Sequence, residues 1–165
     1  MKHFIRPATS ADDFVAARRL FEEYQAWLGV ELCFQGFAAE LDSLAVMYGP
    51  PRGRLLLAET DPAQRSPSDG FAGCIGLRPF DAESCEMKRL FVRADQQGSG
   101  LGRRLIESLI AEAKAIGYRR MMLDTLPQMQ AAQHLYAAFG FRDVDAYYYN
   151  PIAGARYLAL DLATV

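Results

Sequence analysis

The sequence predicts a mixed α/β (α+β) fold in which helices cover both faces of a mostly antiparallel sheet. Segments with strand and helix patterns follow one another in the order β-α-α-β-β-β-α-β-α-β-β. Strands in direct succession favour antiparallel meanders, whereas a helical segment between strands 85–93 and 119–126 predicts one βαβ crossover. At 165 residues, 51% of them hydrophobic, the chain can bury the core of one domain, 1–165.

The N-terminal part is expected to contain one strand, at 3–7, and two helices. Ser10 can cap the first helix, whose apolar residues recur at helical spacing until Gly29 ends it. A second, shorter helix is expected at 36–47.

The remaining elements are expected in the following order. The polar, turn-rich loop 61–70 separates the first two of three successive strands, and Gly117 ends the longest helix. The predicted elements are strands 54–59, 71–78 and 85–93, helix 101–116, strand 119–126, helix 129–139, and strands 141–149 and 155–162.

A glycine-rich turn between strand 85–93 and helix 101–116 carries the most specific signal. Such a turn leaves backbone N–H groups unpaired at a positive helix N-terminus, which is a phosphate site. A phosphate-binding P-loop is excluded because Gly102 is followed by Arg103 and Arg104. A dinucleotide fingerprint is excluded because its third glycine would fall on Arg103 or Leu105.

Two motifs resemble the signatures of the Gcn5-related N-acetyltransferase (GNAT) superfamily. Gln97-x-x-Gly100-x-Gly102 is similar to its Gln/Arg-x-x-Gly-x-Gly/Ala loop, and the segment 132–141 is similar to its Ala-x-x-Leu-Tyr-x-x-x-Gly-Phe helix. The resemblance covers nearly the whole chain. Four further strings, at 32–37, 86–90, 123–127 and 149–151, resemble a subgroup of small bacterial acetyltransferases.

This resemblance implies an acyl-CoA N-acyltransferase fold with a six- or seven-stranded sheet that splays between strands 85–93 and 119–126. Acetyl-CoA is the implied co-substrate, with its pantetheine arm in the cleft and its pyrophosphate on the glycine loop. Family members carry a β-bulge near the position of Leu90, which frees backbone groups for the ligand. The expected cofactor-binding residues are Leu90, Phe91, Val92, Gln97, Gly98, Ser99, Gly100, Leu101, Gly102 and Arg103.

The same resemblance implies two catalytic residues. Tyr136 matches the family's general acid for the leaving thiolate, and Glu86 matches a glutamate that serves some members as general base. Tyr136 could instead be a packed helix residue. Glu86 could instead form an ion pair with Lys88 or lie exposed at a strand end. Strand alternation places Glu86, Lys88 and Leu90 on one face.

The expected acceptor site draws on three segments. An acidic acceptor would be favoured if both Lys88 and Arg89 reached the pocket. Consecutive residues of a strand point to opposite faces, however, so one of the two is expected to point away. A small-molecule amine is the expected acceptor, because the chain has no added docking domain; a protein lysine or N-terminus stays open. The expected substrate-binding residues are Phe34, Gln35, Lys88, Tyr149 and Asn150.

The composition bounds the remaining possibilities. A net charge of −2 and the absence of long apolar runs indicate neither a nucleic-acid partner nor a membrane partner. Three cysteines without metal spacing indicate free thiols in a cytoplasmic protein and no metal site. A homodimer through the last strands is an open possibility, as is an internal strand there. A non-catalytic acyl-CoA-binding module is the alternative function.

Overall fold

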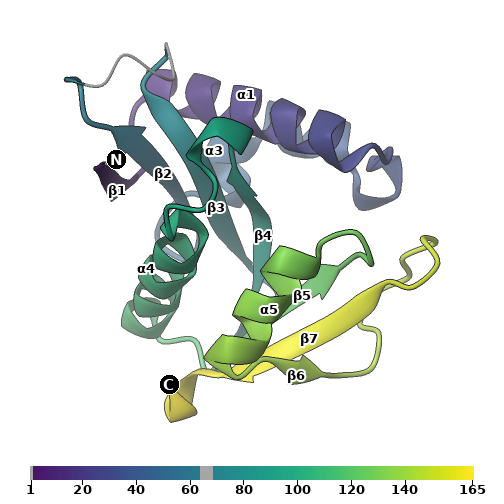
Figure 1. Ribbon diagram of the computed structural model, residues 1–165. Helices are drawn as coiled ribbons and strands as arrows, with labels where there is room; N and C mark the ends of the chain where they lie inside the picture. The colour runs from purple at the N-terminus through teal and green to yellow at the C-terminus, as the bar shows by residue number, and fades with distance from the viewer. Residues whose placement is uncertain (1, 64–68) are drawn as a thin grey trace.

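A computed structural model of the protein describes residues 2–63 and 69–165, so part of the predicted loop 61–70 lies outside the described residues. Within the described chain, a seven-stranded sheet has the order β1-β2-β3-β4-β5-β7-β6 (Figure 1). The strands are β1 (His3–Pro7), β2 (Arg54–Thr60), β3 (Phe71–Pro79), β4 (Ser84–Val92), β5 (Arg120–Thr125), β6 (Arg142–Asp143) and β7 (Arg156–Asp161).

Helices cover both faces of this sheet, as the sequence predicts. One buried cluster packs α4 and α5 against one face, and a second packs α1, α2 and α3 against the other (Figure 1). The helices are α1 (Ala11–Leu28), α2 (Phe37–Asp42), α3 (Leu44–Met47), α4 (Leu101–Ile116) and α5 (Gln130–Phe139). Among these helices, none is long and apolar enough to cross a membrane.

The strands β4 and β5 form the parallel pair that the predicted crossover requires, and α4 connects them. The other neighbouring strands pair antiparallel. The pairing between β4 and β5 covers only Ser84–Glu86 and Arg120–Met122, although β4 continues to Val92. The sheet therefore splays where the family resemblance implies a cleft.

A β-bulge interrupts β4 at Arg89. Cys74 of β3 lies opposite Phe91, and Gly76 lies opposite Lys88, so β4 contains one extra residue. Arg89 adopts a left-handed φ of 61°, which an L residue seldom does outside such a feature. The prediction that Leu90 shares a face with Glu86 and Lys88 is wrong, because the bulge turns Leu90 toward the α4 side of the sheet.

Two predicted elements differ from the structure. The helix expected at 36–47 is divided at Ser43 into α2 and α3. The strand expected at 141–149 is wrong, because only Arg142 and Asp143 pair with β7 before the chain leaves the sheet. Strand β7 lies between β5 and β6, so the last long strand is internal to the sheet.

Candidate active site

The glycine-rich turn leads from β4 into α4 and presents a row of backbone donors. Within the part of the chain that the structure describes, the N–H groups of residues 98–103 have no hydrogen-bond partner. Gly98 and Gly100 adopt φ values of 78° and 77°, and a Cβ on either would meet no atom within 4 Å. The loop is therefore open on its outer side, and its donors fit the pyrophosphate of acetyl-CoA.

The polar side chains of this loop are engaged mainly with the protein itself. Gln97 Nε2 donates to the Val92 carbonyl at 3.0 Å, which ties the loop to the end of β4. Arg103 pairs with Glu107 at 3.1 Å on an exposed helix face. The role of Arg103 toward phosphate stays a prediction.

The gap between β4 and β5 contains a narrow cavity of about 30 Å³. Leu90 lines it from β4, Asp124 from β5, and Tyr136 from α5. The side chains of Phe91 and Val92 pack in the two cores instead and do not line this cavity. The predicted pantetheine cleft thus coincides with a real opening in the sheet.

Tyr136 is buried in this cleft with 4% of its surface exposed. Its hydroxyl has no hydrogen-bond partner among the described residues, and its ring packs on Phe141. Burial raises the pKa of Tyr136 well above its ordinary value. The phenol is therefore protonated at neutral pH and can donate to a group that enters the cleft.

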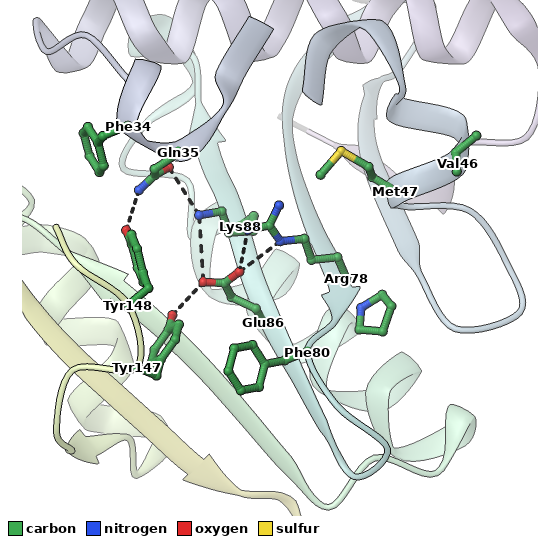
Figure 2. A pocket seen from close by; sticks show the side chains of 11 residues that line it. Phe34, Gln35, Val46, Met47, Arg78, Phe80, Glu86, Lys88, Tyr147 and Tyr148 are labelled. Atoms are coloured by element: carbon green, nitrogen blue, oxygen red, sulfur yellow. Dashed lines mark hydrogen bonds and ion pairs between the residues drawn. The ribbon is translucent and has the colours of Figure 1, made fainter. Parts of the chain in front are cut away.

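A second cavity, of about 520 Å³, lies beside the cleft (Figure 2). It has an apolar rim and a polar interior. We call it the acceptor cavity, and its lining residues are Phe34, Gln35, Val46, Met47, Arg78, Pro79, Phe80, Glu86, Lys88, Tyr147 and Tyr148.

Glu86 lies in the polar interior with 3% of its surface exposed. This excludes the alternative that Glu86 lies exposed at the end of a strand. Its Oε1 accepts a hydrogen bond from Arg78 Nε at 2.9 Å, and its Oε2 accepts one from Tyr147 at 2.7 Å (Figure 2). Lys88 Nζ is 3.9 Å from Oε2. Glu86 thus has the ion pair considered from sequence, although Arg78 is its nearer partner.

Lys88 and Arg89 lie on the same face of β4, so the prediction that they point in opposite directions is wrong. Lys88 alone of the two lines the acceptor cavity, and Arg89 lines the cleft. The bulge inserts one residue at Arg89 and turns its side chain to the face that Lys88 already occupies. Arg89 forms a buried, two-pronged pair with Glu40, at 2.9 and 2.8 Å. Burial, and then Arg89, lower the pKa of Lys88 to about 8.

Asp124 organises the boundary between the cavities. It accepts hydrogen bonds from Tyr148, from Asn150 Nδ2 at 2.9 Å and from Gln35 Nε2 at 3.3 Å. The predicted acceptor residue Asn150 therefore lines the cleft and supports Asp124. The prediction for Tyr149 is wrong: this residue is 81% exposed and lines neither cavity.

Tyr147 and Tyr148 line the acceptor cavity, where Tyr149 was expected, because segment 144–150 is not a strand and does not alternate. Sequence reasoning also missed Arg78 and Glu40. A signal existed for Arg78, since it lies directly opposite Glu86 in the β3–β4 pairing and carries the opposite charge. Glu40 offered no signal, since it is one of two acidic residues in a short helical segment and nothing in its spacing points to Arg89.

The two expected catalytic residues line different cavities, Tyr136 the cleft and Glu86 the acceptor cavity. Phe34, Gln35 and Lys88 line both. These three residues therefore form the boundary between the two cavities.

Comparison with known proteins gives the family. Residues 18–141 match the Acetyltransferase (GNAT) family. An uncharacterized N-acetyltransferase of Schizosaccharomyces pombe is 37% identical over 153 residues, covering 92% of this chain and 88% of its own. An L-amino acid N-acyltransferase of Escherichia coli is 37% identical over 73 residues, covering 44% and 42%.

Solved structures agree on the fold. An acetyltransferase of the GNAT family from Staphylococcus aureus superposes with a TM-score of 0.77 at 18% identity, covering 98% of this chain and 99% of that one. Relatives from a yeast and a bacterium support the family rather than the bacterial subgroup expected from sequence. The chain therefore belongs to the GNAT family and is an acetyl-CoA-dependent N-acetyltransferase.

Proposed function

We propose that this enzyme acetylates the primary amine of a small molecule by direct attack within a ternary complex. The observation that carries the proposal is the shared boundary of the two cavities, lined by Phe34, Gln35 and Lys88. An amine in the acceptor cavity borders the cleft directly, so no covalent carrier on the protein is needed.

The acceptor cavity supports a small molecule over a protein chain. Its volume of about 520 Å³ lies in the range typical of small-molecule sites, about 300–1,000 Å³. An apolar rim around a few convergent polar groups is also typical of such sites. The partial similarity to an L-amino acid N-acyltransferase adds support for a small acceptor.

The reaction needs two proton transfers, one from the attacking amine and one to the leaving sulfur, and a different residue carries out each. When bound, acetyl-CoA supplies an activated acyl group as a thioester. Glu86 takes a proton from the attacking amine through a water molecule, since it lies in the acceptor cavity rather than in the cleft. As the N–C bond forms and the C–S bond breaks, Tyr136 gives its proton to the leaving sulfur. The raised pKa of Tyr136 keeps that proton in place until then.

A cytoplasmic location is part of the proposal, because Cys33, Cys74 and Cys85 are free thiols. The alternatives are a non-catalytic acyl-CoA-binding module and an enzyme that acetylates protein lysines or N-termini. The test is thiol release from acetyl-CoA with amines, amino acids and peptides as acceptors, alongside calorimetric binding of acetyl-CoA.

Turnover with small amines, reduced by Glu86→Gln, is the expected result. Turnover with peptides alone would favour the protein acetyltransferase. Tight acetyl-CoA binding without turnover would favour the binding module.

A further inference from the structure

Lys88 is a buried cation whose hydrogen bonds are incomplete. Its side chain is 3% exposed, and within the described residues its Nζ donates one hydrogen bond, to Gln35 Oε1 at 3.2 Å. The nearest carboxylate oxygens, of Glu86 and Asp124, are 3.9 and 4.0 Å away, beyond hydrogen-bond distance. An ammonium has three donors, and leaving them unmet in a buried site is costly.

The two arginines beside Lys88 are already paired. Arg78 is bound by Glu86 at 2.9 Å, and Arg89 is held by both oxygens of Glu40. The guanidinium of Arg89 also donates to Gln35 at 2.7 Å. Among these three cations, Lys88 is thus the one without a carboxylate oxygen at hydrogen-bond distance, and it is the one that lines both cavities.

The position of Lys88 fits an acceptor that carries an oxyanion close to its amine. Lys88 lines both the acceptor cavity and the cleft, and Figure 2 shows its ammonium between Gln35 and Glu86 in the polar interior. The ligand's anion would therefore lie next to the place where the amine must react. In an α-amino acid the carboxylate and the amine are attached to the same carbon.

The charges of the site favour a ligand that is neutral overall. The cations Arg78, Lys88 and Arg89 are balanced by three carboxylates, those of Glu40, Glu86 and Asp124. A zwitterion adds no net charge to this buried cluster, whereas an anion or a polyamine would. The rest of the acceptor would contact the apolar lining, to which Phe34, Met47 and Phe80 belong.

We propose that the acceptor is an α-amino acid with an apolar side chain, whose carboxylate is bound by Lys88. This proposal rests on the proposed function and narrows its substrate class. The carboxylate supplies the oxygens that the ammonium lacks, and the rim of the acceptor cavity contacts the side chain. Lys88 thereby becomes the residue that distinguishes an amino acid from a simple amine.

The test compares acceptors in matched pairs that differ only by the carboxylate: leucine with isoamylamine, and phenylalanine with phenethylamine. The wild-type enzyme should prefer the amino acid in kcat/KM by roughly 10- to 100-fold, the contribution of a hydrogen bond to a charged group. Lys88→Met should remove this preference by lowering kcat/KM for the amino acid about 10- to 100-fold more than kcat/KM for the matched amine. Lys88→Arg, which keeps the charge, should retain part of the preference.

Each outcome has a definite meaning. Calorimetric binding of acetyl-CoA shows that Lys88→Met is folded, and circular dichroism serves as a second check. Equal or better turnover of the amine by the wild type would overturn the carboxylate inference while leaving the transferase intact. A preference that survives in Lys88→Met would have the same meaning. Turnover with peptides alone would overturn both the carboxylate inference and the proposed small-molecule acceptor. A wild type that binds acetyl-CoA but acetylates no acceptor would instead refute the proposed function.

Discussion

Lys88 and Arg89 are adjacent in the sequence, yet both donate hydrogen bonds to one atom, Gln35 Oε1, at 3.2 and 2.7 Å. Consecutive residues of a regular strand point to opposite faces, so only the bulge at Arg89 permits this convergence. The amide nitrogen of Gln35 donates to Tyr148 at 2.7 Å and to Asp124 at 3.3 Å. A single glutamine therefore connects both sides of the cleft.

Tyr136→Phe should lower kcat by about 10²- to 10⁴-fold, the usual contribution of general acid catalysis, without changing the Kd of acetyl-CoA. The variant keeps the buried ring and removes only the proton donor. Tyr118→Phe is the matched control, since it removes another buried hydroxyl, one that donates to the Arg52 carbonyl at 2.8 Å. Steady-state kinetics with calorimetric binding checks the prediction, and equal kcat values for the two variants would contradict it.

Gly100→Ala should weaken acetyl-CoA binding by about tenfold or more, because a Cβ would project into the open side of the loop and strain its left-handed backbone. Gly117→Ala provides the control at the other end of α4, where φ is 108° and the position is likewise open. Both variants should lose similar stability. Isothermal calorimetry should find weaker binding in Gly100→Ala alone, and equal affinities would argue against the loop as the pyrophosphate site.

Glu40→Gln should destabilise the protein by about 3–5 kcal/mol, because it leaves the Arg89 charge buried without its partner. The pair is enclosed: the side chains of Arg89 and Glu40 are 3% and 0% exposed. The double variant Glu40→Leu/Arg89→Met, which removes both charges, should recover most of the loss. Urea unfolding measures each value, and a double variant no more stable than the single one would speak against this account.

Binding of hydrocinnamate, a carboxylate without an amine, should depend on pH through Lys88. Burial, and then Arg89 and Arg78, oppose protonation, while Glu86 and Asp124 favour it, and the resulting pKa is about 8. The ammonium is present below this pH and lost above it. The Kd should therefore be constant between about pH 6 and pH 7, where the ligand is a carboxylate and Lys88 is charged, and rise about tenfold per unit above about pH 8.

Lys88→Arg should abolish this pH dependence, because a guanidinium stays charged throughout the range. Fluorescence or calorimetric titration at several pH values measures the effect. A flat profile in the wild type, or the same rise in Lys88→Arg, would mean that another group controls the binding.

Features set by local chemistry could be predicted from the sequence. The glycine loop, the start of α4 and its end at Gly117 follow from short-range turn and capping preferences, and the structure has them. The short pairing of β4 with β5 agrees with the cleft that the family resemblance implied.

Features set by tertiary contacts could not be predicted. The segment 141–149, rich in aromatic residues, is predicted as a strand, but Tyr147 and Tyr148 lie outside the sheet and bind Glu86 and Asp124. The face of Arg89 depends on a bulge whose position is defined by the pairing with β3. The buried partner of Arg89, Glu40, lies on an element distant in sequence, so no local spacing connects the two.

Strands β4 and β5 pair over only three residues each. The sheet therefore consists of two parts, β1–β4 and β5–β7–β6, that are joined by this short pairing. Beyond this pairing, side-chain hydrogen bonds connect the two parts: Tyr147 binds Glu86, and Gln35 binds Asp124. Rotation of one part of the sheet relative to the other would stretch these side-chain hydrogen bonds without breaking the backbone hydrogen bonds within either part. The cleft and the acceptor cavity both have lining side chains on each side of the opening between β4 and β5, so an acyl chain that widens the cleft is expected to change the shape of the acceptor cavity.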